Sequence, residues 1–302
     1  MSLHLAQETS MVRRQTFNLN RFLARHAVRI ATYAVLVFCA FLILFPLSWA
    51  FVSSVKPNNQ IFKVPLEWVP TWTAEGWSWD WQFQNFVLPF QTKPFGQFML
   101  NSLFAAVCSV MLSLIVASLA GYSLAKYRYV GKNIAFLAIL STLMLPVQVI
   151  LVPLYLVVRD LGWLDTYQGL IIPQAVNAFS IFLMRQHFLG IPDDYVEAAR
   201  LDGASEVGIL LRVVLPMSRA SMATVALLAF LASWDSYIWP LVAVTKEQMR
   251  TLPLGLSLFF GEYGSEYNQA LAAAVVIMLP MLIVFILLQR YFVEGMTRSG
   301  LK

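Results

Sequence analysis

The chain alternates between long apolar runs and shorter polar connections. Six runs are long enough to be membrane spans, near residues 30–52, 98–121, 133–158, 167–184, 220–244 and 268–289. A helix that crosses a bilayer needs about 20 predominantly apolar residues, and Asp235 is the single charged residue in all six runs. Because a charge at mid-bilayer costs about 2.5–3.5 kcal/mol on insertion scales, the pattern predicts six transmembrane segments.

These segments are expected to be helices. In lipid each backbone N–H and C=O must find a partner inside the protein, which a helix provides by itself, whereas a barrel would show alternating segments of about 10 residues. Kinks are expected at Pro146, Pro153 and Pro280, which lie inside predicted spans. Of the 302 residues, 12% are charged, about half the fraction of a soluble domain. The sequence therefore predicts an all-α integral membrane protein.

Positive charge predicts the orientation of the spans. Lysine and arginine gather before the first run, in the second and fourth connections, and after the last run. Under the positive-inside rule, both termini of this inner-membrane protein are expected in the cytoplasm, with an N-terminal segment at 1–29, a six-helix membrane domain at 30–292 and a tail at 293–302. The net charge of +5 then reflects topology and gives no argument for nucleic-acid binding.

The first outer loop, residues 53–97, is rich in tryptophan. An interfacial aromatic belt is the favoured interpretation, and a surface for docking or for stacking on sugar is the alternative. Cys39 and Cys108 fall within predicted spans and are expected to be small buried apolar residues. No cysteine or histidine spacing indicates a metal site.

The fourth connection carries seven charges between residues 193 and 212 and predicts two short helices. Asp194 is expected to be the N-cap of the first helix, with Glu197 reaching back as its capping-box partner. Gly203 fits the left-handed position that ends a helix. Ser205 would cap a second helix over 206–215, which Pro216 ends or kinks. The first helix is too short to be stable alone, so another surface must hold it.

The stretch "EAARLDGASEVGILLRVVLP", residues 197–216, closely resembles the EAA loop of ABC-transporter import permeases. That pattern has Glu-Ala-Ala, a glycine after three residues, and Ile-x-Leu-Pro after nine more; Val213 stands where it prefers isoleucine. Other stretches resemble the carbohydrate-uptake class of the maltose-transporter type: 101–132, 146–173, 233–241, 250–256 and 289–302.

The resemblance implies a type I importer permease with six transmembrane helices and a cytoplasmic coupling helix between helices 4 and 5. Such a subunit forms half of a translocation pathway for a sugar or sugar-like solute. It works with a second permease subunit, two ATPase subunits and an extracytoplasmic solute-binding protein. ATP and Mg are expected on the ATPase subunits and no cofactor on this chain, which lacks the G-x-x-x-x-G-K-[ST] phosphate-binding pattern.

The resemblance also supplies candidate residues. Those expected to couple the chain to the ATPase are Glu197, Ala198, Ala199, Arg200, Asp202, Gly203 and Pro216. Glu197 could equally serve only as a capping partner, and Arg200 and Asp202 as a solvated face. In the fifth span, Asp235 is a functional candidate because charges inside spans are costly, with Trp234 and Tyr237 as groups that could stack on a sugar; a charge satisfied by neighbours is the other interpretation.

Two other classes of protein remain as alternatives. An ion-gradient-driven secondary transporter would show more ionisable residues at mid-membrane, and often internal repeats. An integral membrane enzyme would need clustered histidine, acid or serine at catalytic spacing, whereas His4, His26 and His187 are scattered.

Overall fold

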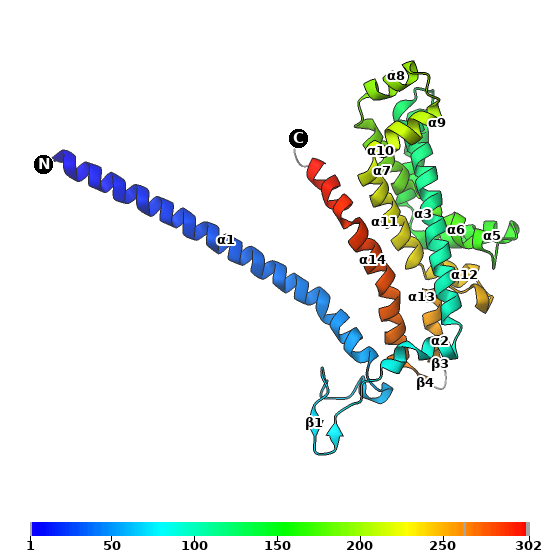
Figure 1. Cartoon of the computed structure of the whole chain (residues 1–302). Coiled ribbons are helices and arrows are strands. Elements are labelled where there is room, and N and C mark those ends of the chain that lie inside the picture. Colours follow the sequence, from blue (N-terminus) through cyan, green and yellow to red (C-terminus); the bar gives the residue numbers. More distant parts are fainter. Residues whose placement is uncertain (1, 262–263, 300–302) are drawn as a thin grey trace.

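The computed structural model describes residues 2–261 and 264–299, and the side chains of residues 26–260 and 265–291. Within these ranges the chain is mostly helical, with two very short hairpins (Figure 1). The predicted cytoplasmic positions of residues 1 and 300–302 fall outside the described residues.

The first helix, α1 (Ser2–Ser54), stands apart from the rest of the molecule along most of its length (Figure 1). It contains the predicted first span and continues the polar lead-in without a break. Its apolar part, His26–Ser54, is long enough to cross a bilayer, and none of its most apolar window is buried inside this chain. The surface of α1 therefore has to be covered by lipid or by another protein.

Four helices form the body of the molecule: α3 (Phe95–Lys126), α7 (Ala178–Leu189), α11 (Arg219–Trp234) and α14 (Tyr267–Ser299). Helix α3 packs against α7 and α11, and α14 packs against α11. A Cβ at Gly121 would lie only 3.0 Å from the Met184 Cβ, so a glycine there lets α3 and α7 approach closely. Buried side chains form one apolar cluster at each end of this body, and α3 contributes to both.

The third and fourth predicted spans are bent. In the third, α4 (Lys132–Ser141) and the 3-10 turn η3 (Thr142–Met144) meet α5 (Val147–Asp160) at 108°. The break lies at Pro146, which lacks an N–H and keeps the preceding residue extended. In the fourth, α6 (Tyr167–Ala175) meets α7 at 45°. The expected kink at Pro146 is confirmed, whereas Pro153 and Pro280 lie inside continuous helices.

Three described helices are long and apolar enough to cross a membrane: His26–Ser54, Phe95–Lys126 and Tyr267–Tyr291. The number rises to six when each of three bent helix pairs is taken as one span. The predicted fifth span, 220–244, covers α11 and a second short helix, α12 (Ile238–Ala243), with a break between them. The boundaries of the six segments therefore stay a prediction.

Short elements gather at the end of the molecule where α1 reaches the body (Figure 1). One hairpin pairs β1 (Trp72–Thr73) with β2 (Gly76–Trp77), and the other pairs β3 (Phe260–Gly261) with β4 (Gly264–Ser265). Neither hairpin was predicted from the sequence. The other short helices in residues 58–92 and 247–259 are η1 (Asn58–Gln60), η2 (Phe83–Phe86), α2 (Leu88–Thr92), η5 (Glu247–Met249), α13 (Leu252–Gly255) and η6 (Leu256–Phe259).

The tryptophan-rich loop is organised around Lys56, which is 1% exposed. Its ammonium group lies 4.5 Å from the ring centroid of Trp49 and 4.8 Å from that of Trp79, and it donates to the backbone oxygen of Glu67. Trp79 is consequently buried, while Trp72, Trp77 and Trp81 are exposed. The loop thus has a folded base and exposed rings, which suits an interfacial belt and a docking surface equally.

Candidate functional site

The predicted helix–turn–helix forms the end of the molecule opposite the two hairpins (Figure 1). Its first helix, α8 (Asp193–Leu201), begins two residues earlier than predicted. Pro192 occupies the N-cap position and makes no side-chain cap, so the prediction of Asp194 as N-cap is wrong. Proline fits here because it has no N–H to leave unpaired. Asp193 and Asp194 lie in the first turn, where acidic side chains interact favourably with the helix dipole.

The turn after α8 is set by Gly203, which has a φ of +78°. The Gly203 N–H donates to the Arg200 oxygen at 3.0 Å, and the Ala204 N–H donates to the Ala199 oxygen at 3.0 Å. These two bonds are those of a Schellman motif, which confirms the predicted left-handed turn. A Cβ at Gly203 would meet nothing within 4 Å, so the need for glycine is conformational and not a matter of space.

The second helix starts as predicted and is then distorted. The Ser205 hydroxyl accepts from the Gly208 N–H at 3.2 Å and caps α9 (Glu206–Ile209). A π-helical segment, η4 (Leu210–Val214), and α10 (Leu215–Met217) follow, and the chain turns through 87° into α11. Pro216 lies inside α10 and, having no N–H, cannot make the regular helical bond to the preceding turn. The second helix thus ends at Met217, one residue beyond Pro216, and the bend follows at Ser218.

Helix α8 buries one side and presents the other. Val196 is 2% exposed and joins the apolar cluster at this end, whereas Tyr195 is 53% and Leu201 90% exposed. The predicted coupling residues on the loop are mostly accessible as well: Glu197, Ala198, Arg200, Asp202, Gly203 and Pro216 are exposed, and Ala199 is partly buried. An exposed leucine on a short charged helix is a surface that a partner protein could cover.

Arg200 is not simply a solvated charge, because its side chain is paired within the chain. Its Nε donates to Glu206 Oε1 at 2.7 Å and its Nη2 to Oε2 at 3.2 Å. The Tyr127 hydroxyl donates to Glu206 Oε2 at 2.8 Å, and the Tyr122 hydroxyl donates to it at 3.2 Å. These four residues, the Glu206 cluster, connect the end of α8, the start of α9 and the end of α3, beside an open pocket of about 290 Å³.

Sequence reasoning missed the Glu206 cluster. The two tyrosines lie about 80 residues before Glu206 in the chain, so no local pattern joins them to it. The signal that was present is a carboxylate in the first turn of α9, six residues after Arg200. That spacing places the two groups together only because the Gly203 turn folds one helix back on the other.

The start of α8 is also fastened to α3. Lys126 Nζ donates to Asp193 Oδ1 at 2.6 Å and to the Ile191 oxygen at 2.5 Å. The Lys126 side chain is 4% exposed, and the hydrogen bond and charge of Lys126 lower the pKa of Asp193. Both ends of α8 are therefore held against the same stretch of α3, residues 122–127.

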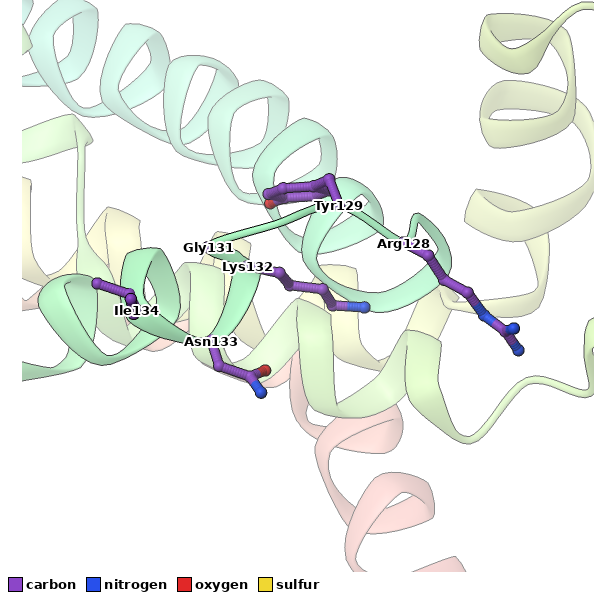
Figure 2. A pocket seen from close by; sticks show the side chains of 6 residues that line it. All are labelled: Arg128, Tyr129, Gly131, Lys132, Asn133 and Ile134. Atoms are coloured by element: carbon purple, nitrogen blue, oxygen red, sulfur yellow. The ribbon is translucent and has the colours of Figure 1, made fainter.

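The segment that follows α3 is itself anchored. Figure 2 shows the Lys132 side chain running beneath the turn that carries Tyr129 and Gly131. Its Nζ donates to the Tyr127 oxygen at 2.8 Å and to the Ala125 oxygen at 3.3 Å. An open pocket of about 410 Å³, lined by residues 128–129 and 131–134, lies here. The hydrogen bonds from Lys132 thus hold the backbone that positions Tyr127.

The Glu206 cluster gives this end a defined acid response. The hydrogen bond from Arg200, followed by those from Tyr127 and Tyr122, lowers the pKa of Glu206 from 4.5 to about 2. Since the folded-state pKa of Glu206 lies below its unfolded value, the cluster contributes its full stabilisation of the folded state above about pH 4.5. Its contribution is lost as the pH falls through about 2.

We therefore expect hydrogen–deuterium exchange in residues 193–209 to be the same at pH 8 and pH 6 and to rise between pH 4.5 and pH 2, after correction for intrinsic rates. Glu206→Gln should already exchange faster at pH 6 and show a smaller further rise, the remainder coming from Asp193. Identical acid profiles for the variant and the parent would contradict the assignment.

The three candidate residues in the fifth span have different surroundings in the structure. Trp234 is 1% exposed, its ring stacks on Phe230 at 5.5 Å, and its Nε1 donates to the Ile277 oxygen at 3.0 Å. The Trp234 ring is packed in the core between α11 and α14, so it cannot stack on a sugar in this conformation. Asp235 and Tyr237 lie in the break between α11 and α12, and both are exposed. These two remain candidates for the pathway.

Within residues 2–261 and 264–299, no three histidine, cysteine, aspartate or glutamate side chains lie together as metal ligands would. At the α8 end, an exposed helical face is tied to α3 through contacts at both ends of α8.

Comparison with known proteins identifies the class. A family model described as "Binding-protein-dependent transport system inner membrane component" matches residues 113–298, and the chain belongs to this family. It is 34% identical over 277 residues to the arabinooligosaccharides transport system permease protein AraQ of Halalkalibacterium halodurans, covering 88% of this chain and 93% of the relative. It is 33% identical over 280 residues to the sn-glycerol-3-phosphate transport system permease protein UgpE of Pectobacterium atrosepticum, covering 91% and 98%.

A solved structure has the same fold. A chain of a bacterial ABC transporter involved in the import of the acidic polysaccharide alginate superposes with a TM-score of 0.74 at 28% identity, covering 87% of this chain and 95% of that one. The resemblance seen in the sequence is thereby confirmed: the fold is that of a type I ABC importer permease, and the chain is an inner-membrane transport component. The alternative of an ion-gradient-driven secondary transporter is wrong.

Proposed function

We propose that this permease forms one half of the translocation pathway for a sugar or sugar-like solute and couples it to a separate ATPase subunit through residues 197–216. The names of the relatives support a carbohydrate-type solute, because they specify arabinooligosaccharides, glycerol-3-phosphate and alginate. The observation that carries the coupling role is α8 itself. It is a nine-residue helix with an exposed Leu201 and Glu197, held rigidly on the body by both ends.

In this proposal α8 is the coupling helix and lies on the cytoplasmic side, where it sits in a cleft of one ATPase subunit. ATP and Mg bind to the ATPase subunits and not to this chain. When ATP closes the ATPase pair, the coupling helices of the two permease subunits approach each other. The membrane helices then shift between inward-facing and outward-facing states, an equilibrium biased by the differential binding of ATP. The opposite end, with the two hairpins, would face an extracytoplasmic solute-binding protein.

A second permease subunit completes the pathway. The exposed apolar surface of α1 and the projecting α5 (Figure 1) support an arrangement in which this chain does not stand alone. A different permease is the expected partner, giving a heterodimer surrounded by lipid. In the pathway, Asp235 is proposed to accept hydrogen bonds from hydroxyl groups of the solute and Tyr237 to stack on its ring.

The coupling role is tested by Glu197→Lys in the complete importer purified from membranes. Reversing the charge on the exposed face of α8 is expected to reduce the ATPase subunit that copurifies, and to abolish ATP-driven uptake, while the amount of permease in the membrane is unchanged. Glu75→Lys, an equally exposed charge reversal on the opposite end, is the matched control and should copurify normally. Wild-type copurification and uptake by Glu197→Lys would overturn the assignment.

A further inference from the structure

The Glu206 cluster ties the coupling helix to a membrane helix that is distant from it in the sequence. Helix α8 is joined covalently to α11 through the Gly203 turn, the π-helical η4 and the 87° bend. Each of these is a place where a helical chain can deform, because regular hydrogen bonding is interrupted there. Movement passed along the chain alone would therefore be partly absorbed before it reached α11.

Helix α3 offers a stiffer route. It is an unbroken α-helix of 32 residues, about 48 Å long at 1.5 Å per residue. At one end, residues 122–127 hold both ends of α8 through Lys126–Asp193 and the Glu206 cluster. A displacement of α8 must move this end of α3 with it as long as both ties hold.

The far end of α3 holds the second outer loop. Asn101 is fully buried, and its Nδ2 donates to the Gln248 oxygen at 2.8 Å and to the Arg250 oxygen at 2.9 Å. The Ser102 hydroxyl accepts from the Leu252 N–H at 2.7 Å. The segment 248–252, which follows the fifth predicted span, is thereby fixed to the same helix that carries α8 at its other end.

We propose that Glu206 is a positioning residue that locks the coupling helix to α3, so that α3 carries the movement of α8 to the outer loop at 248–252. This inference rests on the proposed coupling role of α8. One exposed ion pair is worth little, but here a single carboxylate receives hydrogen bonds from an arginine and two tyrosines. Such a shared network fixes geometry more firmly than separate pairs do.

The test measures how many solute molecules are imported for each ATP hydrolysed by the reconstituted complete importer. Glu206→Gln removes the charge, and the pair Tyr122→Phe with Tyr127→Phe removes the two hydroxyls while keeping the rings. Both are expected to lower the import-to-hydrolysis ratio about fivefold or more, the lower range of typical coupling energies. Glu67→Gln, which loses a partly exposed ion pair with Lys63 on the far loop, is the matched control and should keep the parental ratio.

A second readout separates positioning from general damage. Spin labels at Ala204→Cys and Leu119→Cys, in a Cys39→Ala and Cys108→Ala background with cysteine-free partners, report the distance between the α8–α9 turn and α3. In the parent this distance should be the same with and without ATP. In Glu206→Gln it should shift or broaden when ATP is added.

The outcomes are distinct for the two proposals. An unchanged import-to-hydrolysis ratio in Glu206→Gln, or a label distance that ATP changes equally in parent and variant, would overturn the role of Glu206 alone. Loss of the ATPase subunit from Glu206→Gln would also overturn it, since the residue would then shape the docking surface and not the link. Failure of the coupling helix itself would appear separately, as normal uptake by Glu197→Lys.

Discussion

Gly203→Pro is expected to abolish ATP-driven uptake while the protein still inserts and accumulates normally. The native φ of +78° is closed to proline, whose ring holds φ near −65°. The substitution also removes the N–H that donates to the Arg200 oxygen. Helix α8 would then leave the body in another direction, and Arg200 could no longer reach Glu206. Because Gly203 is exposed and has open space around it, the apolar core is not disturbed.

Two further variants make this result interpretable. Asparagine tolerates left-handed backbone better than other residues, so Gly203→Asn should retain most uptake. Gly203→Val, which pays about 1–2 kcal/mol for the left-handed conformation, should fall between asparagine and proline. The measurement is solute uptake with membrane amounts normalised by immunoblot. Wild-type uptake by Gly203→Pro would sink the coupling assignment.

Trp234→Ala is expected to lower the stability of the chain by about 3–5 kcal/mol, the usual cost of removing a buried aromatic side chain. The residue is almost completely buried, stacks on Phe230 and donates to the Ile277 oxygen. Its loss leaves a cavity between α11 and α14. The apparent melting temperature of the detergent-purified protein, and its yield, should both fall.

Tyr237→Ala is the matched control, since Tyr237 is 42% exposed in the break after α11. Exposed substitutions usually change stability by no more than about 0.5 kcal/mol, so the melting temperature should hardly move. If Tyr237 contacts the solute as proposed, the KM for uptake rises in this variant without loss of protein. A melting temperature that is unchanged in Trp234→Ala would contradict the core role of that tryptophan.

The local signals in the sequence were reliable where the physics is local. Gly203 and Ser205 act through bonds to residues at most five positions away, so their roles could be predicted from the order of residues alone. The N-cap was misplaced by two residues because Pro192 and Asp194 both suit the start of a helix, and only the observed backbone distinguishes them. The break at Pro146 was expected for the same local reason, while the bend after Ala175 was not.

The sequence by itself determined that this is a helical inner-membrane permease with a glycine-ended charged helix, because long apolar runs and the spacing of the EAA stretch depend only on residue order. Only the tertiary structure decided what that helix is attached to. Tyr122 and Tyr127 meet Glu206 because the residues that follow Glu206 pack in the same apolar cluster as α3, which brings positions about 80 residues apart together. Likewise, packing between α11 and α14 turned Trp234 inward and left Asp235 and Tyr237 accessible. The sequence pattern of an apolar run with a few polar residues does not specify which of these three side chains is buried.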